Sequence, residues 1–118
     1  MGGYFFVWIK MNKENSLKKS YEIERLIKNK KSVGNKYYAI YYDFNDKTKV
    51  AFSINKKVGK AYIRNYNKRV TREIIRNNFE SVKNLKLLIV IKEKSTELSY
   101  IDKEKELLKL LSQIRKEN

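Results

Sequence analysis

A run of basic side chains between Val58 and Asn78 is the part of the sequence best suited to chemistry, and that chemistry is phosphate binding. The run reads VGKAYIRNYNKRVTREIIRNN and holds six basic residues but a single acid, Glu73. On a helix, at about 100° per residue, six of its polar residues fall on an arc roughly 140° wide: Arg64, Asn65, Lys68, Arg69, Arg72 and Arg76. Acids that would pair with these charges four residues away are nearly absent. Because the planar arginine side chain holds two phosphate oxygens at once, the pattern predicts a phosphate-binding face.

Another arc of the same segment is apolar, and it predicts a helix with one buried flank. Ile63, Tyr66, Val70 and Ile74 fall on this arc. We expect the helix to extend over residues 60–78, with Gly59 allowing the turn that leads into it. Such an amphipathic helix would pack its apolar flank on the protein and present its basic flank to a partner.

Tyrosines offer a second kind of chemistry, the stacking of unpaired bases. The sequence has nine tyrosines, and four of them lie in YYAIYYDF, whose aromatic and β-branched residues predict a strand over Tyr37–Phe44. Alternation places Tyr38 and Tyr42 on the core face, and Tyr37 and Tyr41 on a lighter, more polar face that could be an open surface. For Tyr37 and Tyr41, ordinary packing and base stacking both stay open, and stacking would contribute about 1–3 kcal/mol per base.

The titratable residues argue against a self-contained catalytic centre. The chain has no cysteine and no histidine, which excludes disulfides, zinc fingers, Cys/His nucleophile pairs and Ser-His-Asp triads. Metal-dependent cleavage of a phosphodiester needs acids gathered around two ions. Asp43 and Asp46 lie at an expected turn, Asp102 has the position of a helix cap, and the other acids are scattered glutamates. We therefore expect no catalytic residue and no metal site formed by this chain.

Length and charge fit one folded domain with a polyanionic partner. The chain has 118 residues, which suffice for a single core. Its 28 basic and 13 acidic residues give a formal net charge of +15, while 42% of the residues are hydrophobic. The charge is therefore carried on a folded body, and nucleic acid is the favoured partner, ahead of an anionic membrane or an acidic protein.

Residues 1–10, MGGYFFVWIK, read as an N-terminal extension. Their apolar run is too short to span a bilayer and lacks the flanking residues of a signal peptide. We expect a loosely ordered arm over residues 1–10 and a single domain over residues 11–118, with a membrane anchor as the minority alternative.

The remaining periodicities place the basic helix inside an α+β or α/β fold. The strand before it alternates and the strand after it is a continuous apolar run, which suggests a parallel pair joined by a crossover. The final helix opens with capping-box spacing and carries a leucine-rich stripe. The expected elements are a helix over 20–29, a short strand or turn at 32–35, strands at 37–44 and 49–55, the basic helix, a strand at 85–91 and a helix from Ser99 onward.

The segment VGKAYIRNYNKRVTREII resembles the signature of the bacterial ribonuclease P protein component family. That family carries a serine-x-lysine-lysine strand end, a glycine turn, then arginine-asparagine-arginine, lysine-arginine and a further arginine. SINKKVG stands at the strand end and turn, and the basic residues that match are Arg64-Asn65, Lys68-Arg69 and Arg72. The resemblance covers about 100 residues, from Leu17 to the last helix.

The sequence departs from the family pattern at several positions. Tyr66 replaces the second arginine of arginine-asparagine-arginine, and Asn55 replaces a usual serine. Ile23 and Ile27 stand where the family often has phenylalanines, whereas Tyr41 matches the family's cleft tyrosine.

The resemblance implies a fold and two binding surfaces. The fold is a four-stranded sheet with three helices, the ribosomal protein S5 domain 2-like fold, with a left-handed βαβ crossover that is an exception to the right-handed rule. The basic arc would bind the catalytic RNA subunit, and the cleft between the sheet and the first helix would hold the single-stranded 5′ leader of precursor tRNA. The expected lining of that cleft is Tyr41, Tyr37, Lys56, Lys57, Ile23 and Ile27.

The resemblance also assigns bond breaking to RNA. The chain would be the protein subunit of a cytoplasmic endoribonuclease that matures the 5′ ends of tRNA, with Mg²⁺ bound mainly by the RNA subunit. Its partners would be ribonuclease P RNA and precursor tRNA, with no membrane and no obligatory protein partner. The alternatives are a non-enzymatic RNA-binding protein of similar fold, such as a ribosomal protein, and a self-sufficient nuclease.

Overall fold

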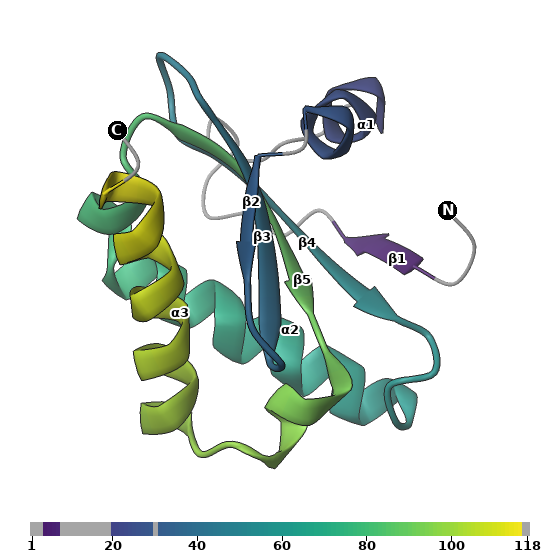
Figure 1. The fold of residues 1–118 in the computed structure, drawn as a ribbon. Helices are drawn as coiled ribbons and strands as arrows, with labels where there is room; N and C mark the ends of the chain where they lie inside the picture. The colour runs from purple at the N-terminus through teal and green to yellow at the C-terminus, as the bar shows by residue number, and fades with distance from the viewer. Residues whose placement is uncertain (1–3, 8–19, 30, 117–118) are drawn as a thin grey trace.

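The computed structural model of the chain describes residues 4–7, 20–29 and 31–116 as a sheet with helices on both faces (Figure 1). Three α-helices and five strands make up most of this part of the chain, and two short 3₁₀ helices join them. The elements are β1 (Tyr4–Val7), α1 (Ser20–Lys28), β2 (Ser32–Gly34), β3 (Tyr38–Phe44), β4 (Lys49–Asn55), α2 (Ala61–Asn77), η2 (Phe79–Val82), β5 (Leu85–Ile91), η3 (Glu93–Glu97) and α3 (Tyr100–Lys116).

The strands form one mixed sheet in the order β1-β4-β5-β3-β2. The strands β2 to β5 are the four that the sequence led us to expect, and with three α-helices they confirm the α+β fold. β4 and β5 are parallel, with Val50 opposite Leu87, whereas the other neighbouring pairs are antiparallel.

The fifth strand comes from the N-terminal segment that we expected to be loosely ordered. The backbone of Tyr4–Val7 pairs antiparallel with β4, Tyr4 lying opposite Asn55 and Val7 opposite Phe52. The rest of residues 1–10 lies outside the described residues. A short strand at this edge occupies backbone groups that β4 would otherwise present for pairing.

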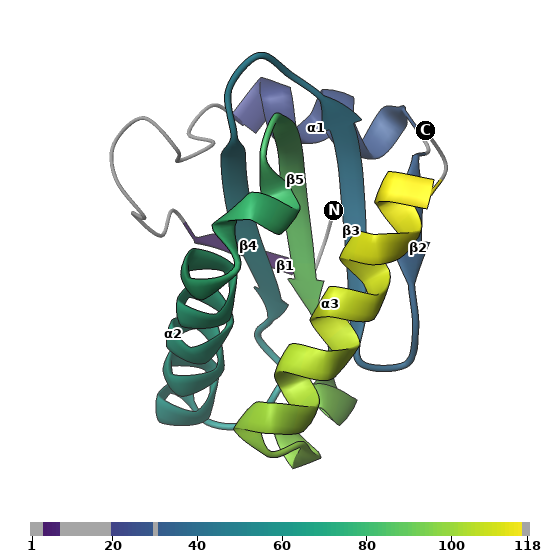
Figure 2. The ribbon, with the colours of Figure 1, turned by 90° about the vertical axis from the view of Figure 1, so that its left-hand side faces the viewer.

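The connection from β4 through α2 to β5 is a left-handed crossover. In Figure 2 both strands run downward, α2 and α3 lie on the face toward the viewer, and β5 lies to the right of β4. A right-handed crossover through that face would place the second strand to the left of the first. The crossover therefore carries α2 along the edge of the fold, beside β4, rather than over the centre of the sheet.

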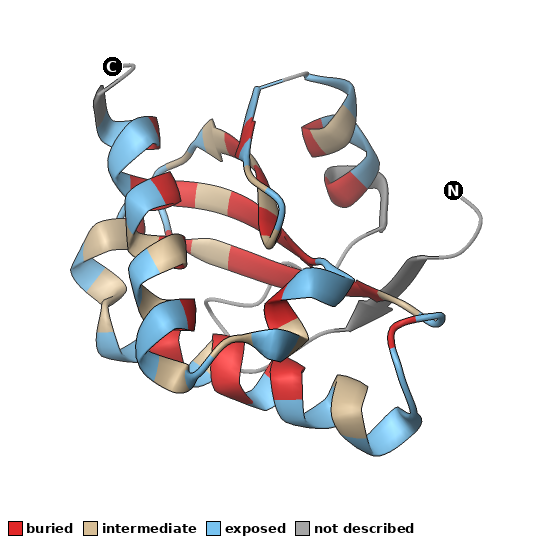
Figure 3. Cartoon of the chain, turned by 60° about the horizontal axis from the view of Figure 1, so that its bottom comes forward, coloured by how far each residue is buried: buried red, intermediate tan, exposed pale blue. Residues whose placement is uncertain are grey.

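One large core fills the space between the sheet and the pair of helices α2 and α3. Alternate strand residues point into it, among them Tyr38, Ile40 and Phe52. The expected stripe of α3 is confirmed as buried: Leu107, Leu110, Leu111 and Ile114. Figure 3 shows buried residues on the sheet and on the helix flanks that face it, with exposed residues outward.

The other face of the sheet is covered by α1, so the open surface suggested by strand alternation is wrong in part. Ile23 and Leu26 of α1 are buried against Ala51, Leu88 and Val90 of the sheet. Because α1 is a short helix lying across this face, it leaves a margin of half-buried residues beside it. Alternation within a strand cannot reveal this cover, since it depends on where a separate helix packs.

Candidate nucleic-acid interface

A tight turn between β4 and α2 sets the start of the basic helix. Gly59 has a φ of +58°, and a Cβ there would lie 3.1 Å from the side chain of Ile63. This left-handed conformation favours glycine. The helix that follows has no acidic residue in its first turn. The positive charge of the helix therefore begins directly at the turn.

Burial divides α2 into a packed flank and a basic flank, as the sequence predicted. Val70, Ile74 and Ile75 are buried in the core. We call the six residues of the predicted arc the basic strip: Arg64, Asn65, Lys68, Arg69, Arg72 and Arg76. Asn65, Arg69 and Arg76 are exposed, while Arg64 and Arg72 are half-buried.

The strip is positive because basic residues far outnumber acids along α2, where Glu73 is the single acid. Between described residues, the ion pairs Lys31–Asp43 and Lys109–Glu106 do not engage the guanidinium groups of the strip. The Nε atom of Arg72 is buried and has no hydrogen-bond partner among the described residues. A buried donor of this kind is costly unless it is satisfied, so a phosphate oxygen reaching Arg72 would be favoured.

Lys68 is more buried than the helical wheel suggested. It is 9% exposed, and burial, together with the nearby charge of Arg64, lowers the pKa of its ammonium group. Desolvation and a like charge both disfavour the protonated form of a lysine. A phosphate bound beside Lys68 would have the opposite effect and raise its pKa, so anion binding and protonation of Lys68 support each other.

Tyr66 does not belong to the packed flank, and the prediction that placed it there is wrong. It is 54% exposed. The ammonium of Lys103, from α3, lies 5.3 Å from the centre of its ring. Tyr66 lies at the boundary of the apolar arc, and the start of α3 covers one side of its ring without burying it.

The α1 face brings together three of the residues expected to line a leader cleft. Ile23, Ile27 and Tyr41 belong to one apolar cluster. Ile23 is only 2% exposed, so it supports the surface more than it contributes to it. Ile27 and Tyr41 are half-buried and supply the accessible part.

Tyr37 lies elsewhere, and its assignment to the same face as Tyr41 is wrong. It precedes β3 and packs against the core between the sheet and the helices α2 and α3. The carboxamide oxygen of Asn35 accepts hydrogen bonds from the backbone N–H groups of Tyr37 and Tyr38, at 2.8 and 2.9 Å. This local turn ends the strand alternation at Tyr38, so the alternation does not predict which face of the sheet Tyr37 lies on.

Lys56 and Lys57 are exposed in the turn between β4 and α2. A hollow of about 280 Å³ at the ends of β4 and β5 connects this turn to the α1 face. Its lining is Asn55, Lys57, Val58, Val90, Ile91, Lys92 and Glu93. Val90 also belongs to the apolar cluster under α1. The hollow therefore joins Lys57 of the turn to that cluster.

The sequence reasoning missed the contribution of β5 to this hollow. From the sequence, Val90 is placed only in a buried strand and Lys92 has no role. The register of the sheet places Val90 beside Ala39 and Ser53, and this neighbourhood depends on the crossover. No local pattern in the sequence marks it.

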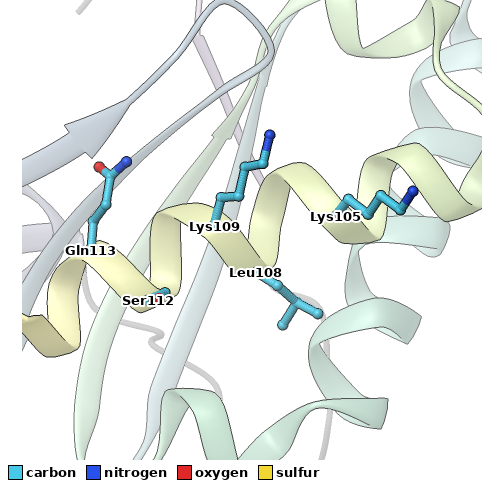
Figure 4. A pocket seen from close by; sticks show the side chains of 5 residues that line it. All are labelled: Lys105, Leu108, Lys109, Ser112 and Gln113. Carbon is cyan, nitrogen blue, oxygen red and sulfur yellow. The ribbon is translucent and has the colours of Figure 1, made fainter.

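A larger hollow of about 540 Å³ lies along α3 (Figure 4) and includes no residue of the basic strip in its lining. Its lining comes from a single helix: Lys105, Leu108, Lys109, Ser112 and Gln113. Figure 4 shows these side chains spread along the helix and pointing in different directions. Lys109 is paired with Glu106 at 3.5 Å. Size alone therefore does not locate the interface.

In the described part of the chain, no three acidic side chains come together in a way that could hold a metal ion. No helix there is both long and apolar enough to cross a membrane.

A family model described as Ribonuclease P matches residues 11–115. The ribonuclease P protein component of Mycoplasma mycoides subsp. mycoides SC is 32% identical over 109 residues, covering 89% of this chain and 100% of that protein. The ribonuclease P protein component of Alkaliphilus oremlandii is 35% identical over 106 residues, covering 85% of this chain and 90% of that protein.

Solved structures with the same fold carry related names. The ribonuclease P protein of Staphylococcus aureus superposes with a TM-score of 0.77 at 22% identity, covering 85% of this chain and 94% of that one. The ribonuclease P protein of Thermotoga maritima superposes with a TM-score of 0.73 at 25% identity, covering 86% of this chain and 97% of that one.

Proposed function

This chain belongs to the bacterial ribonuclease P protein family and is the protein component of that ribonucleoprotein endoribonuclease, and we propose that it binds through two surfaces. The basic strip of α2 binds the RNA subunit. The α1 face, together with the turn between β4 and α2, binds the single-stranded 5′ leader of precursor tRNA. In this way the protein promotes maturation of the 5′ end of tRNA.

The observation that carries the first half of the proposal is the basic strip itself. Asn65, Arg69 and Arg76 are exposed along one side of a helix whose other side is packed in the core. Ion pairs between described residues do not engage the guanidinium groups of Arg64, Arg69, Arg72 or Arg76. Guanidinium groups at one-turn spacing suit a phosphate backbone, since each can hold two oxygens.

The leader surface combines the two features that bind single strands without sequence preference. These are an aromatic side chain for stacking and cations for the backbone. Tyr41 supplies the aromatic ring beside Ile27 on the α1 face. Lys56 and Lys57 supply exposed charge at the strand ends. A single RNA strand lying over Val90 would reach from Tyr41 to the lysines of the turn, because the hollow there is lined by both Val90 and Lys57.

Bond breaking belongs to the RNA subunit in this scheme, with Mg²⁺ bound mainly by the RNA. Mg²⁺ is commonly held by phosphate oxygens and water with few protein ligands, and no three carboxylates converge among the described residues. The chain's contribution is to hold substrate and RNA together and to offset phosphate repulsion near the metal ions.

The test is reconstitution with a bacterial ribonuclease P RNA at low Mg²⁺. We expect the protein to restore 5′ processing of precursor tRNA under conditions where the RNA alone is inactive. The double variant Arg69→Ala/Arg76→Ala should lose most of this effect, because both substitutions remove exposed charge from the strip. Absence of any stimulation by the wild-type protein would contradict the proposal. Cleavage by the protein without RNA would favour a self-sufficient nuclease.

A further inference from the structure

A third hollow, on α2, holds two exposed aromatic side chains that the proposed function does not use. It has a volume of about 450 Å³ and is lined by Tyr62, Ile63, Tyr66, Asn67 and Thr96. We call it the tyrosine hollow. Tyr62 is 68% exposed and Tyr66 is 54% exposed. They are four residues apart and therefore neighbours on the helix surface.

The ring of Tyr66 is held in place from one side. The ammonium of Lys103 lies 5.3 Å from the centre of the ring. Lys103 is itself only 3% exposed, so it is fixed by its surroundings. Contact between a cation and an aromatic face is attractive. Tyr66 is thus an aromatic surface with little freedom to lose when a planar group stacks on it.

Asn67, at the edge of the tyrosine hollow, offers an unused hydrogen-bond acceptor. The residue is 3% exposed. Its Nδ2 donates to the backbone oxygen of Ile63 at 2.8 Å, and its Oδ1 has no partner among the described residues. A buried carbonyl oxygen without a donor is unfavourable, so the hollow suits a ligand that brings an N–H group.

Charge beside the tyrosine hollow indicates what kind of ligand this is. Arg69, an exposed member of the basic strip, lies three residues after Tyr66 and so beside it on the helix surface. A polyanion held by the strip would pass next to the two rings. Planar groups with N–H donors that are attached to a polyanion are nucleobases.

We propose that the tyrosine hollow binds an unpaired nucleobase of RNA, which stacks on Tyr66 beside Tyr62 and donates an N–H hydrogen bond to Asn67 Oδ1. The exocyclic amines of adenine, cytosine and guanine can supply this donor. The assignment of the base to the RNA subunit rests on the proposed function. The presence of a stacking site at Tyr66 is independent of that function.

The first experiment measures binding of a bacterial ribonuclease P RNA at several salt concentrations. Tyr66→Ala should weaken binding roughly 5- to 150-fold, the range expected for loss of one stacked base, while the salt slope stays as in wild type. Tyr66→Phe should bind as wild type does, because it keeps the aromatic face. Ile101→Ala, which removes an exposed apolar side chain from α3, is the matched control and should change nothing.

Asn67→Leu separates binding from folding. The substitution removes the unpaired Oδ1 together with the Nδ2 hydrogen bond to Ile63, and because these two effects oppose each other the melting temperature should change little. RNA binding should nevertheless weaken. An unchanged affinity for Asn67→Leu would remove the proposed hydrogen bond.

A second experiment tests stacking without the ribonuclease P RNA. In a Trp8→Phe background, Tyr62→Trp gives a single tryptophan whose fluorescence should be quenched by a short oligoadenylate and not by an abasic strand of the same length. If the oligoadenylate quenches the fluorescence but the wild-type protein does not bind ribonuclease P RNA, the proposed function is rejected, while the nucleobase site in the tyrosine hollow is supported. The nucleobase site would be rejected if the fluorescence is not quenched, or if Tyr66→Ala binds the RNA as tightly as wild type. A hollow that binds a peptide instead of a base would give these same results.

Discussion

The guanidinium of Arg64 donates a hydrogen bond from Nη1 to the backbone oxygen of Gly59 at 2.9 Å. The same nitrogen donates to the backbone oxygen of Lys56 at 3.0 Å. One side chain of the basic strip therefore ties the first turn of α2 to the turn that carries the exposed lysines. A guanidinium held in this way has part of its rotamer entropy already lost, which lowers the cost of ordering it on a phosphate.

Arg64→Lys should separate the structural role of this residue from its charge. The substitution keeps the positive charge but loses the fixed fork that reaches two carbonyl oxygens. We expect the free energy of unfolding to fall by about 1 kcal/mol, the net value of hydrogen bonds of this kind. Urea denaturation measures this change. Arg76→Lys, at an exposed position of the same helix, is the control and should stay within about 0.5 kcal/mol of wild type. Equal stability of the two variants would show that the turn does not depend on Arg64.

The salt dependence of RNA binding should fall when a strip residue is removed. Each phosphate contact contributes roughly 0.7–0.9 to the slope of log affinity against log salt. Arg72→Ala and Lys68→Ala should each lower the slope by about that amount and weaken binding of ribonuclease P RNA. Filter binding over a range of salt concentrations gives both quantities. Lys47→Ala, which removes an exposed charge from the β3–β4 turn, should leave the slope unchanged. A slope that stays constant in Arg72→Ala would place Arg72 outside the RNA interface.

Tyr41→Ala should weaken binding of precursor tRNA and leave binding of mature tRNA unchanged. The loss should be about 1–3 kcal/mol if one leader base stacks on the ring. The assay compares the affinities of the reconstituted holoenzyme for the two RNAs. Phe44→Leu is the matched control, because it removes an aromatic ring from the other face of the same strand. Equal losses for precursor and mature tRNA would reject the leader surface around Tyr41.

Periodicity predicted the elements that bury a continuous stripe. The leucine-rich flank of α3 and the packed flank of α2 follow from helical spacing alone, because a flank of this kind has few places to pack. The parallel pair β4 and β5 followed from a strand, a helix and a strand in succession. The left-handed sense of their crossover came from the family resemblance, since the general rule favours the opposite hand.

The features that the sequence did not reveal depend on contacts between distant segments. Tyr66 is exposed, and its neighbour from the first turn of α3 is the ammonium of Lys103 rather than an apolar side chain. Because α1 packs over the sheet, Ile23 is buried, whereas Ile27 and Tyr41 lie beside the contact and are half-buried. Tyr37 left the expected face because Asn35 forms a turn directly before β3. Each outcome was decided by a neighbour that alternation or helical spacing does not include.

The stability of the protein should decrease steeply between about pH 10 and pH 12, and Tyr38 should cause part of this decrease. Tyr38 is fully buried, and burial raises the pKa of its hydroxyl to about 12. The hydroxyl lies near those of Ser95 and Thr71 but makes no well-aligned hydrogen bond. In the unfolded chain the pKa is about 10. The folded state therefore keeps a proton that the unfolded state loses, which makes unfolding easier as the pH rises through this window.

Tyr38→Phe should remove this part of the pH dependence. Two units of pKa correspond to roughly 2–3 kcal/mol, so the stability of the wild type should fall by about that much relative to the variant between pH 10 and pH 12. Lys68 and Lys103 have lowered pKa values, which make stability rise with pH below about 10.5. Both lysines are present in the two proteins, so their effect cancels in the comparison. Urea unfolding at a series of pH values measures the difference, with the exposed Tyr62→Phe as control. Parallel curves for wild type and Tyr38→Phe would show that the hydroxyl titrates at its ordinary pKa in the folded protein.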